Sequence, residues 1–170
     1  MSLSLWFILL VALAAVLAGL LCCVRHRHAP SPENALPSEG LRLNRHPLHY
    51  AVFKNDFNTV NRLLGEGASP RQTMADGQTP LHVAAECGLA AMCKFLLKNS
   101  AEVDALDNFG GSPLHAAAAC QSGVAVIRIL VEKGADIHLK DAAGMTPLAL
   151  SKKYKHARIA AYLKSLGAGQ

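Results

Sequence analysis

The chain has 170 residues, 51% of them hydrophobic and 17% charged, a length that fits one ordinary domain with an appendage. Five cysteines, an odd number, exclude a complete disulfide framework. The formal net charge of +5 comes from the flanks, because residues 46–150 carry eight Lys or Arg against ten Asp or Glu. This distribution argues against a nucleic-acid-binding domain, which needs a continuous basic face.

After a short tail at residues 1–4, residues 5–24 contain no charged or strongly polar side chain. At about 1.5 Å per residue, a helix of this length crosses the roughly 30 Å hydrocarbon layer of a bilayer. A secretory signal has a positive n-region and a shorter apolar core, and no Lys or Arg precedes this run. We therefore expect a single transmembrane helix, with a signal peptide cleaved near Ala18 as the alternative.

The residues directly after this run bear on topology. Arg25 and Arg27 lie there, so the positive-inside rule predicts that the C-terminal side is cytoplasmic. Cys22 and Cys23 are either plain apolar residues at the membrane edge or acylation sites in a eukaryotic cell. Residues 25–43 are first basic and then proline-rich, which indicates a linker.

One phrase recurs four times in the rest of the chain, with its prolines 33, 33 and 34 residues apart. The four copies are His46-Pro47-Leu48-His49, Thr79-Pro80-Leu81-His82, Ser112-Pro113-Leu114-His115 and Thr146-Pro147-Leu148-Ala149. Thr or Ser before Pro predicts an N-cap followed by the first helical residue. Apolar residues at helical spacing then predict a second helix in each unit, ended in two units by Gly67 and Gly134.

This period and phrase resemble the ankyrin repeat. The resemblance implies an all-α solenoid of helix pairs with β-turn fingers at residues 44–167, followed by a tail at 168–170. Its repeats are expected at about 44–76, 77–109, 110–143 and 144–167. It also implies that the repeated histidine makes hydrogen bonds that brace the fingers.

No catalytic or metal-binding pattern accompanies the repeats. His82 with Cys87 and His115 with Cys120 share a spacing of five residues, but on a helix this points the two side chains about 140° apart. No phosphate loop, nucleophile elbow or dinucleotide fingerprint occurs. We expect no enzymatic activity, no cofactor, no metal, no nucleic acid and no small-molecule substrate.

Ankyrin domains typically bind proteins with their finger tips and the concave face of their first helices. Carried over by position, the resemblance implies partner contacts at Gln72, Met74, Gln78, Glu86, Leu106, Asn108, Phe109, Lys140, Lys153 and Tyr154. Phe109, a large aromatic on a projecting turn, is the expected anchor.

The expected function is a membrane-anchored scaffold or adaptor for a protein partner, with a cytoplasmic repeat domain. The alternative is a secreted or periplasmic binding factor whose N-terminal segment is a signal peptide or an inward-facing anchor. The five basic residues after position 150 form either a solvated cap face or a contact with anionic lipid.

Overall fold

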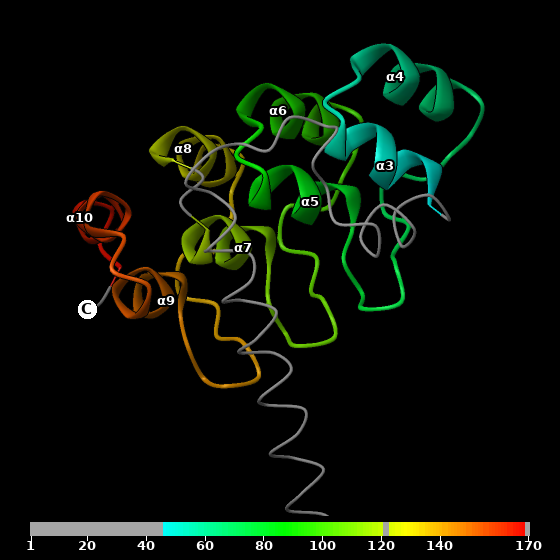
Figure 1. The fold of residues 1–170 in the computed structure, drawn as a ribbon. Helices are drawn as coiled ribbons and strands as arrows, with labels where there is room; N and C mark the ends of the chain where they lie inside the picture. The colour runs from blue at the N-terminus through cyan, green and yellow to red at the C-terminus, as the bar shows by residue number, and fades with distance from the viewer. Residues whose placement is uncertain (1–45, 121–122, 169–170) are drawn as a thin grey trace, which may run out of the picture.

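The computed structural model describes residues 46–120 and 123–168, and within these ranges the chain forms eight helices and no strand (Figure 1). The helices are α3 (Pro47–Phe53), α4 (Phe57–Gly65), α5 (Pro80–Glu86), α6 (Ala90–Lys98), α7 (Pro113–Ala119), α8 (Val124–Glu132), α9 (Pro147–Lys153) and α10 (Ala157–Ser165). The expected all-α repeat architecture is confirmed for this part of the chain.

Two expected segments, the transmembrane helix at residues 5–24 and the linker at 25–43, lie outside the described residues. The same holds for Cys22, Cys23, Arg25 and Arg27. None of the helices that the structure describes combines the length and hydropathy needed to cross a bilayer.

The helices form two rows (Figure 1). Helices α3, α5, α7 and α9 lie side by side in the first row, and α4, α6, α8 and α10 form the second row, above the first in this view. The segments that lead from one pair to the next project from the first row as loops. We call these the first finger (residues 66–79), the second finger (99–112) and the third finger (133–146). Each pair packs on its neighbours, so the core is a strip that runs through the stack.

The first helix of a unit begins at the Thr/Ser-Pro pair because both residues favour a helix start. In α5, Thr79 is the N-cap and Pro80 the first helical residue, where a missing N–H costs no hydrogen bond. The ring of His82 turns back, and its Nδ1 accepts the backbone N–H of Thr79 at 3.1 Å. This is a capping box with histidine in the position that Glu or Gln usually takes. Ser112 and His115 repeat it in α7 at 3.2 Å.

The second helix of a unit ends in a left-handed residue that starts the finger. Gly67 and Gly134 have φ of +94° and +90°, as expected from the sequence. The next residue then bonds back into the helix, for instance Ala135 N–H to the carbonyl of Leu130 at 3.0 Å. This bond satisfies a helix-end carbonyl and fixes the direction in which the finger leaves.

The core is built from the leucine of each repeated phrase and the apolar stripe of each second helix. Leu48, Leu81, Leu114 and Leu148 are all buried. The second helices contribute the buried residues Val60, Met92, Leu96, Val126, Ile127, Leu130, Ile159 and Leu163. Pairs of fully buried alanines, such as Ala84 and Ala85 in α5, let the helices of the first row approach closely.

The core position of Leu114 predicts a large loss of stability on truncation. Leu114→Ala removes a fully buried side chain and should lower the free energy of unfolding by about 2–5 kcal/mol. Leu106→Ala deletes the same atoms from a side chain that is 53% exposed and should change it by no more than about 0.5 kcal/mol. Urea unfolding followed by circular dichroism measures both, and equal losses would contradict this core assignment.

Candidate functional site: the fingers and the first-helix face

Each finger tip is a tight turn held by its own side chains. In the second finger, Oδ1 of Asp107 accepts the backbone N–H of Phe109 at 2.9 Å and of Gly111 at 2.8 Å. Asp141 does the same in the third finger, where it accepts from Ala143 at 2.9 Å and Met145 at 2.8 Å. The aspartates of the recurrent Asp-x-x-Gly motif therefore bind the finger's own backbone amides.

Neighbouring fingers are joined to one another near their tips. Asn108 donates its backbone N–H to the carbonyl of Asp76 at 3.0 Å and its side-chain amide to the carbonyl of Ala75 at 2.9 Å. Ala142 donates its N–H to the carbonyl of Phe109 at 2.8 Å. The approach is so close that a Cβ on Gly77 would lie 2.6 Å from Oδ1 of Asn108. The three fingers thus form a connected row.

The histidines of the repeated phrase tie each first helix to the following finger. Nε2 of His49, His82 and His115 lies 3.0, 3.0 and 3.1 Å from the carbonyl oxygens of Gln78, Gly111 and Met145. In His82 and His115 the Nδ1 accepts a backbone N–H, so the proton is on Nε2, which donates to the finger. The bracing role that the family resemblance implied is present in all three copies.

Burial keeps these rings neutral. Desolvation lowers the pKa of His82 and His115, and it lowers that of His49 to about 4. Nδ1 of His49 has no hydrogen-bond partner among the described residues. In the next two copies the hydroxyls of Thr79 and Ser112 lie 2.9 Å from the corresponding Nδ1, and His46, which takes their place, has no hydroxyl.

The candidate contact residues differ in how accessible they are. Leu106 and Phe109 are 53% and 46% exposed, and they are the large hydrophobic side chains most open to solvent among the described residues. Asn108, Lys140 and Lys153 are also exposed, whereas Gln72, Gln78, Glu86 and Tyr154 are half-buried. The fingers and their first-helix neighbours can therefore offer most of the expected residues to a partner.

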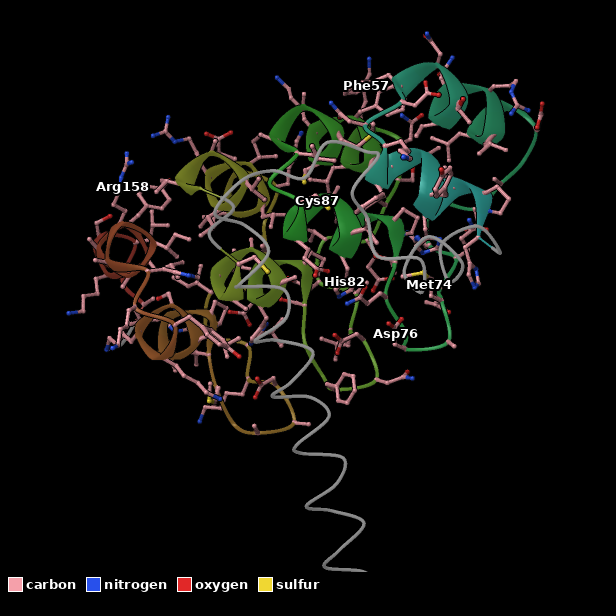
Figure 2. The ribbon with its side chains drawn as sticks, in the orientation of Figure 1. Phe57, Met74, Asp76, His82, Cys87 and Arg158 are labelled. Atoms are coloured by element: carbon pink, nitrogen blue, oxygen red, sulfur yellow. The ribbon has the colours of Figure 1, made fainter. Side chains whose placement is uncertain are left out.

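Met74 is the exception, and its placement on the contact surface needs correction. Its side chain is only 9% exposed and belongs to the hydrophobic core (Figure 2). Met74 donates its N–H to Gln78 O as Asp107 does to Gly111 O, so it takes the inward position of the turn-forming aspartate. The 33-residue alignment of Met74 with Asp107 was the signal in the sequence that indicated this.

The exposed face of the first helices changes character along the row. At its two ends, Nζ of Lys54 lies 5.5 Å from the ring centre of Tyr50, and Nζ of Lys153 lies 5.7 Å from that of Tyr154. Between them, Cys87, the C-cap of α5, and Ala116 of α7 are smaller and half-buried. Tyr50 was not among the contact residues predicted from the sequence. The repeat period aligns it with Val83 and Ala116, so a large aromatic residue at a position with smaller residues in the next two copies was the signal that could have found it.

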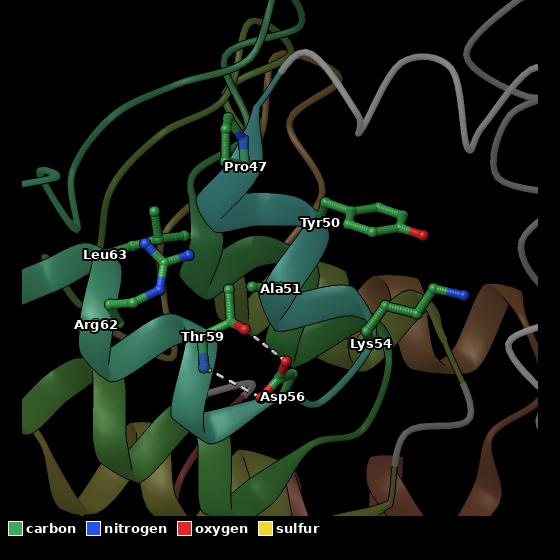
Figure 3. Close-up of a pocket in the computed structure, with 8 residues that line it drawn as sticks. All are labelled: Pro47, Tyr50, Ala51, Lys54, Asp56, Thr59, Arg62 and Leu63. Carbon is green, nitrogen blue, oxygen red and sulfur yellow. Dashed lines mark hydrogen bonds between the residues drawn. The ribbon is translucent and has the colours of Figure 1, made fainter.

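The hollow between the first two helices shows little that would bind a small ligand. A hollow of about 220 Å³ lies between α3 and α4 (Figure 3). Its Asp56 accepts hydrogen bonds from Thr59, whose hydroxyl and backbone N–H hold the pKa of that carboxyl below its usual value. Its Arg62 pairs with Glu66 at 2.7 Å. These polar groups are thus already occupied within the chain.

Two other kinds of site were considered in the described residues, a metal site and a reactive cysteine. Within residues 46–120 and 123–168, no cluster of three or more His, Cys, Asp or Glu could hold a metal ion. Cys87, Cys93 and Cys120 form no disulfide with another described residue, and burial raises the pKa of Cys93 to about 12. A thiol with this pKa is protonated at neutral pH.

Comparison with known proteins identifies the repeats. A family model for ankyrin repeats in three copies matches residues 48–141. The chain is 40% identical to human Rabankyrin-5 over 123 residues, which cover 64% of this chain and 10% of that protein. It is 34% identical to the human transient receptor potential cation channel subfamily A member 1 over 123 residues, or 71% of this chain and 10% of the channel. Notch homolog 1 of Xenopus tropicalis is 38% identical over 98 residues, 56% of this chain and 4% of the relative.

These relatives are much longer than the chain, which spans about a tenth of Rabankyrin-5. Their names describe proteins of very different kinds, and the shared part is the repeat. The similarity therefore carries information about the repeat domain, and it does not extend to the activities of the whole relatives.

The neutral histidines predict a loss of stability in acid. The unfolded-state pKa of a histidine is about 6.5, and a histidine whose pKa is lower in the folded state makes its full contribution to stability above pH 6.5. Its contribution falls as the pH drops, and for His49, with a pKa of about 4, the loss reaches about 3 kcal/mol. Unfolding free energies measured between pH 7 and pH 4 should show this decline. His49→Gln retains a donor to Gln78 but does not titrate, so it should reduce the slope; an unchanged slope would contradict the assignment.

Proposed function

Because the chain belongs to the ankyrin-repeat family, whose domains are generally non-enzymatic protein-binding modules, we propose that it is an adaptor that recruits a protein partner to a membrane. The partner binds the finger tips, with the second finger as the main contact. The apolar residues 5–24 attach the chain to the bilayer, and the repeat domain faces the cytoplasm.

One observation carries the binding half of this proposal. Leu106 and Phe109 belong to the same finger and expose about half of their surface. Large apolar side chains in the middle of an interface commonly supply most of its binding energy. The finger that presents them is bonded to the first finger through Asn108 and to the third through the carbonyl of Phe109. Binding therefore requires little ordering of this backbone, which favours affinity.

The rest of the contact surface surrounds this anchor. Lys140 occupies the third finger, and Gln72 and Gln78 belong to the first. Glu86, Lys153 and Tyr154 extend the surface onto the first helices. These residues are mostly polar, the composition expected of an interface rim around an apolar anchor.

The membrane half of the proposal depends on the sequence of a segment outside the described residues. Residues 5–24 are apolar throughout and long enough to span a bilayer. Arg25 and Arg27 favour a cytoplasmic location for the linker and the repeat domain. Acylation of Cys22 or Cys23 would strengthen attachment on the same side.

The binding anchor predicts a variant that folds normally but binds poorly. Phe109→Ala should leave the free energy of unfolding within about 0.5 kcal/mol of the parent, because its side chain lies outside the core. Loss of a central interface aromatic should weaken binding by about 2 kcal/mol or more, roughly thirtyfold.

The measurement is an affinity capture with quantitative mass spectrometry, in which the parent, Phe109→Ala and Lys94→Ala are compared. Lys94 is exposed on α6, in the row of helices away from the fingers, and serves as the matched control. Proteins held by the parent and Lys94→Ala but lost with Phe109→Ala support the proposal. A captured set that is identical for all three would remove the finger as the binding surface.

The orientation of the chain should follow the flanking arginines. Replacing Arg25 and Arg27 by Asn and inserting two lysines after Met1 should invert or scramble insertion, since Lys and Arg near the span set its orientation. Protease protection of the repeat domain in sealed vesicles reports the change. Replacing Lys94 and Lys98 by Asn removes as many charges far from the span and should leave the topology intact. If the swapped chain keeps the protease-accessible side of the parent, the cytoplasmic assignment is wrong.

A further inference from the structure

The fourth repeat carries a concentrated basic surface. Between Ala142 and Ala168 the chain has five Lys or Arg and no Asp or Glu. These are Lys152, Lys153, Lys155, Arg158 and Lys164, and all five are exposed. We call this set the basic cap. None of its members forms an ion pair with another described residue, whereas Arg62 on α4 is paired with Glu66. Figure 2 shows Arg158 at the end of the molecule remote from Phe57.

A hollow of about 280 Å³ lies within this basic surface. It is lined by Ser151, Lys152, Lys155, Ala157 and Ala160. The small alanine side chains of α10 leave room between the two lysines. The hydroxyl of Ser151 is bonded to the carbonyl of Leu148 at 2.8 Å, so the ammonium groups are the polar groups of the hollow that can turn to a ligand.

Lys155 has a backbone conformation that is unfavourable for lysine. Its φ is +60°, a left-handed conformation that favours glycine and asparagine. The equivalent positions in the first and second repeats are Asn55 (φ +56°) and Gly88 (φ +72°). In the fourth repeat a lysine is held in this unfavourable conformation, next to the hollow. Unfavourable backbone conformations that persist often mark functional positions.

The chemistry of the surface favours a lipid membrane over a protein as the ligand. Protein interfaces rely on buried aromatic or aliphatic anchors at their centre. The exposed large hydrophobic side chains of the described chain are on the second finger, and none lies on the described residues of α9 or α10. An anionic membrane surface needs only positive charge, and each Lys or Arg near it strengthens attachment about fivefold.

We propose that the basic cap binds the anionic headgroups of a membrane, with a lipid phosphate held between Lys152 and Lys155. The binding of a protein by the second finger is then separated from lipid binding by a full repeat. The inference depends on the membrane attachment proposed above only in that attachment keeps the cap within reach of the bilayer.

The test uses the full chain reconstituted in nanodiscs of neutral phosphatidylcholine, with or without phosphatidylserine. Lysine accessibility is measured by amine-reactive labelling and mass spectrometry. In anionic discs Lys152, Lys155 and Lys164 should be modified about fivefold more slowly than in neutral discs. Lys94 and Lys98, exposed on α6, are internal controls and should react equally in both. Raising the salt concentration should remove the difference.

Several results would overturn the proposal. Equal labelling in both kinds of disc would exclude the lipid surface and favour an acidic protein segment. Protection in neutral discs on addition of inorganic phosphate alone would assign the hollow to a free anion. Failure of the chain to insert into either disc would instead count against the proposed anchor, and the labelling comparison could then be made with vesicles of the same two compositions.

Lys155→Gly separates lipid binding from a structural role. Glycine accepts the left-handed backbone, so this variant should unfold at the same or a higher denaturant concentration than the parent. It should nevertheless reduce the protection of Lys152 and Lys164 in anionic discs. Lys98→Gly is unsuitable as a control because Lys98 is helical, so Lys98→Gln provides the matched removal of one charge. If Lys155→Gly leaves the protection unchanged, the hollow is not the lipid site.

Discussion

The ring of His82 makes two bonds at once, and the geometry of the repeat depends on both. Its Nδ1 accepts the N–H of Thr79 and closes the start of α5, while its Nε2 donates to the carbonyl of Gly111 in the second finger. Only a neutral imidazole with the proton on Nε2 can do this, and burial favours the neutral form. A single side chain therefore links the start of a first helix to the finger that follows it. His115 repeats the arrangement 33 residues later.

Because the bond from His82 to Gly111 holds the base of the second finger, the side chains at its tip are not needed to position it. Asp107 and Asn108 satisfy backbone groups of their own and of the preceding finger, and His82 holds the base. The adjacent side chains of Leu106 and Phe109 then have no part in maintaining the turn. A well-bonded backbone needs little further ordering when an exposed apolar side chain on it contacts another surface, which is the condition that the proposed binding at the second finger requires.

The sequence predicted the regular parts of this structure well because each has a local cause. The Thr/Ser-Pro pair predicts the start of the first helices, and Gly67 and Gly134 predict the end of two second helices. The site was less predictable where a residue departs from its repeat. Met74 was expected at the surface as part of a loop, but it replaces a turn-forming aspartate and packs inward.

Two further details depend on partners distant in sequence. Asn108 was expected as a contact residue, yet its side chain bonds to Ala75, 33 residues earlier, and composition gives no sign of such a bond. Nδ1 of His49 has no partner among the described residues, and the hydroxyl that lies beside this atom in the next two copies is missing at His46, which the sequence shows only once the function of that cap is known.

The fourth repeat is the unit in which the histidine constraint is relaxed. Ala149 stands in the position of His82 and His115, and no finger comes after α10 within the described residues. Thr146 still caps α9 through its hydroxyl, which accepts the N–H of Ala149 at 3.2 Å, so the helix start survives without the ring. A unit in a linear stack is stabilised by its neighbours, and exposed charged side chains cost its core little. The five basic residues of this unit are exposed, while Leu148 and Leu163 are buried. The fourth repeat thus keeps its helix cap and its core without the histidine, and its charge lies on exposed side chains.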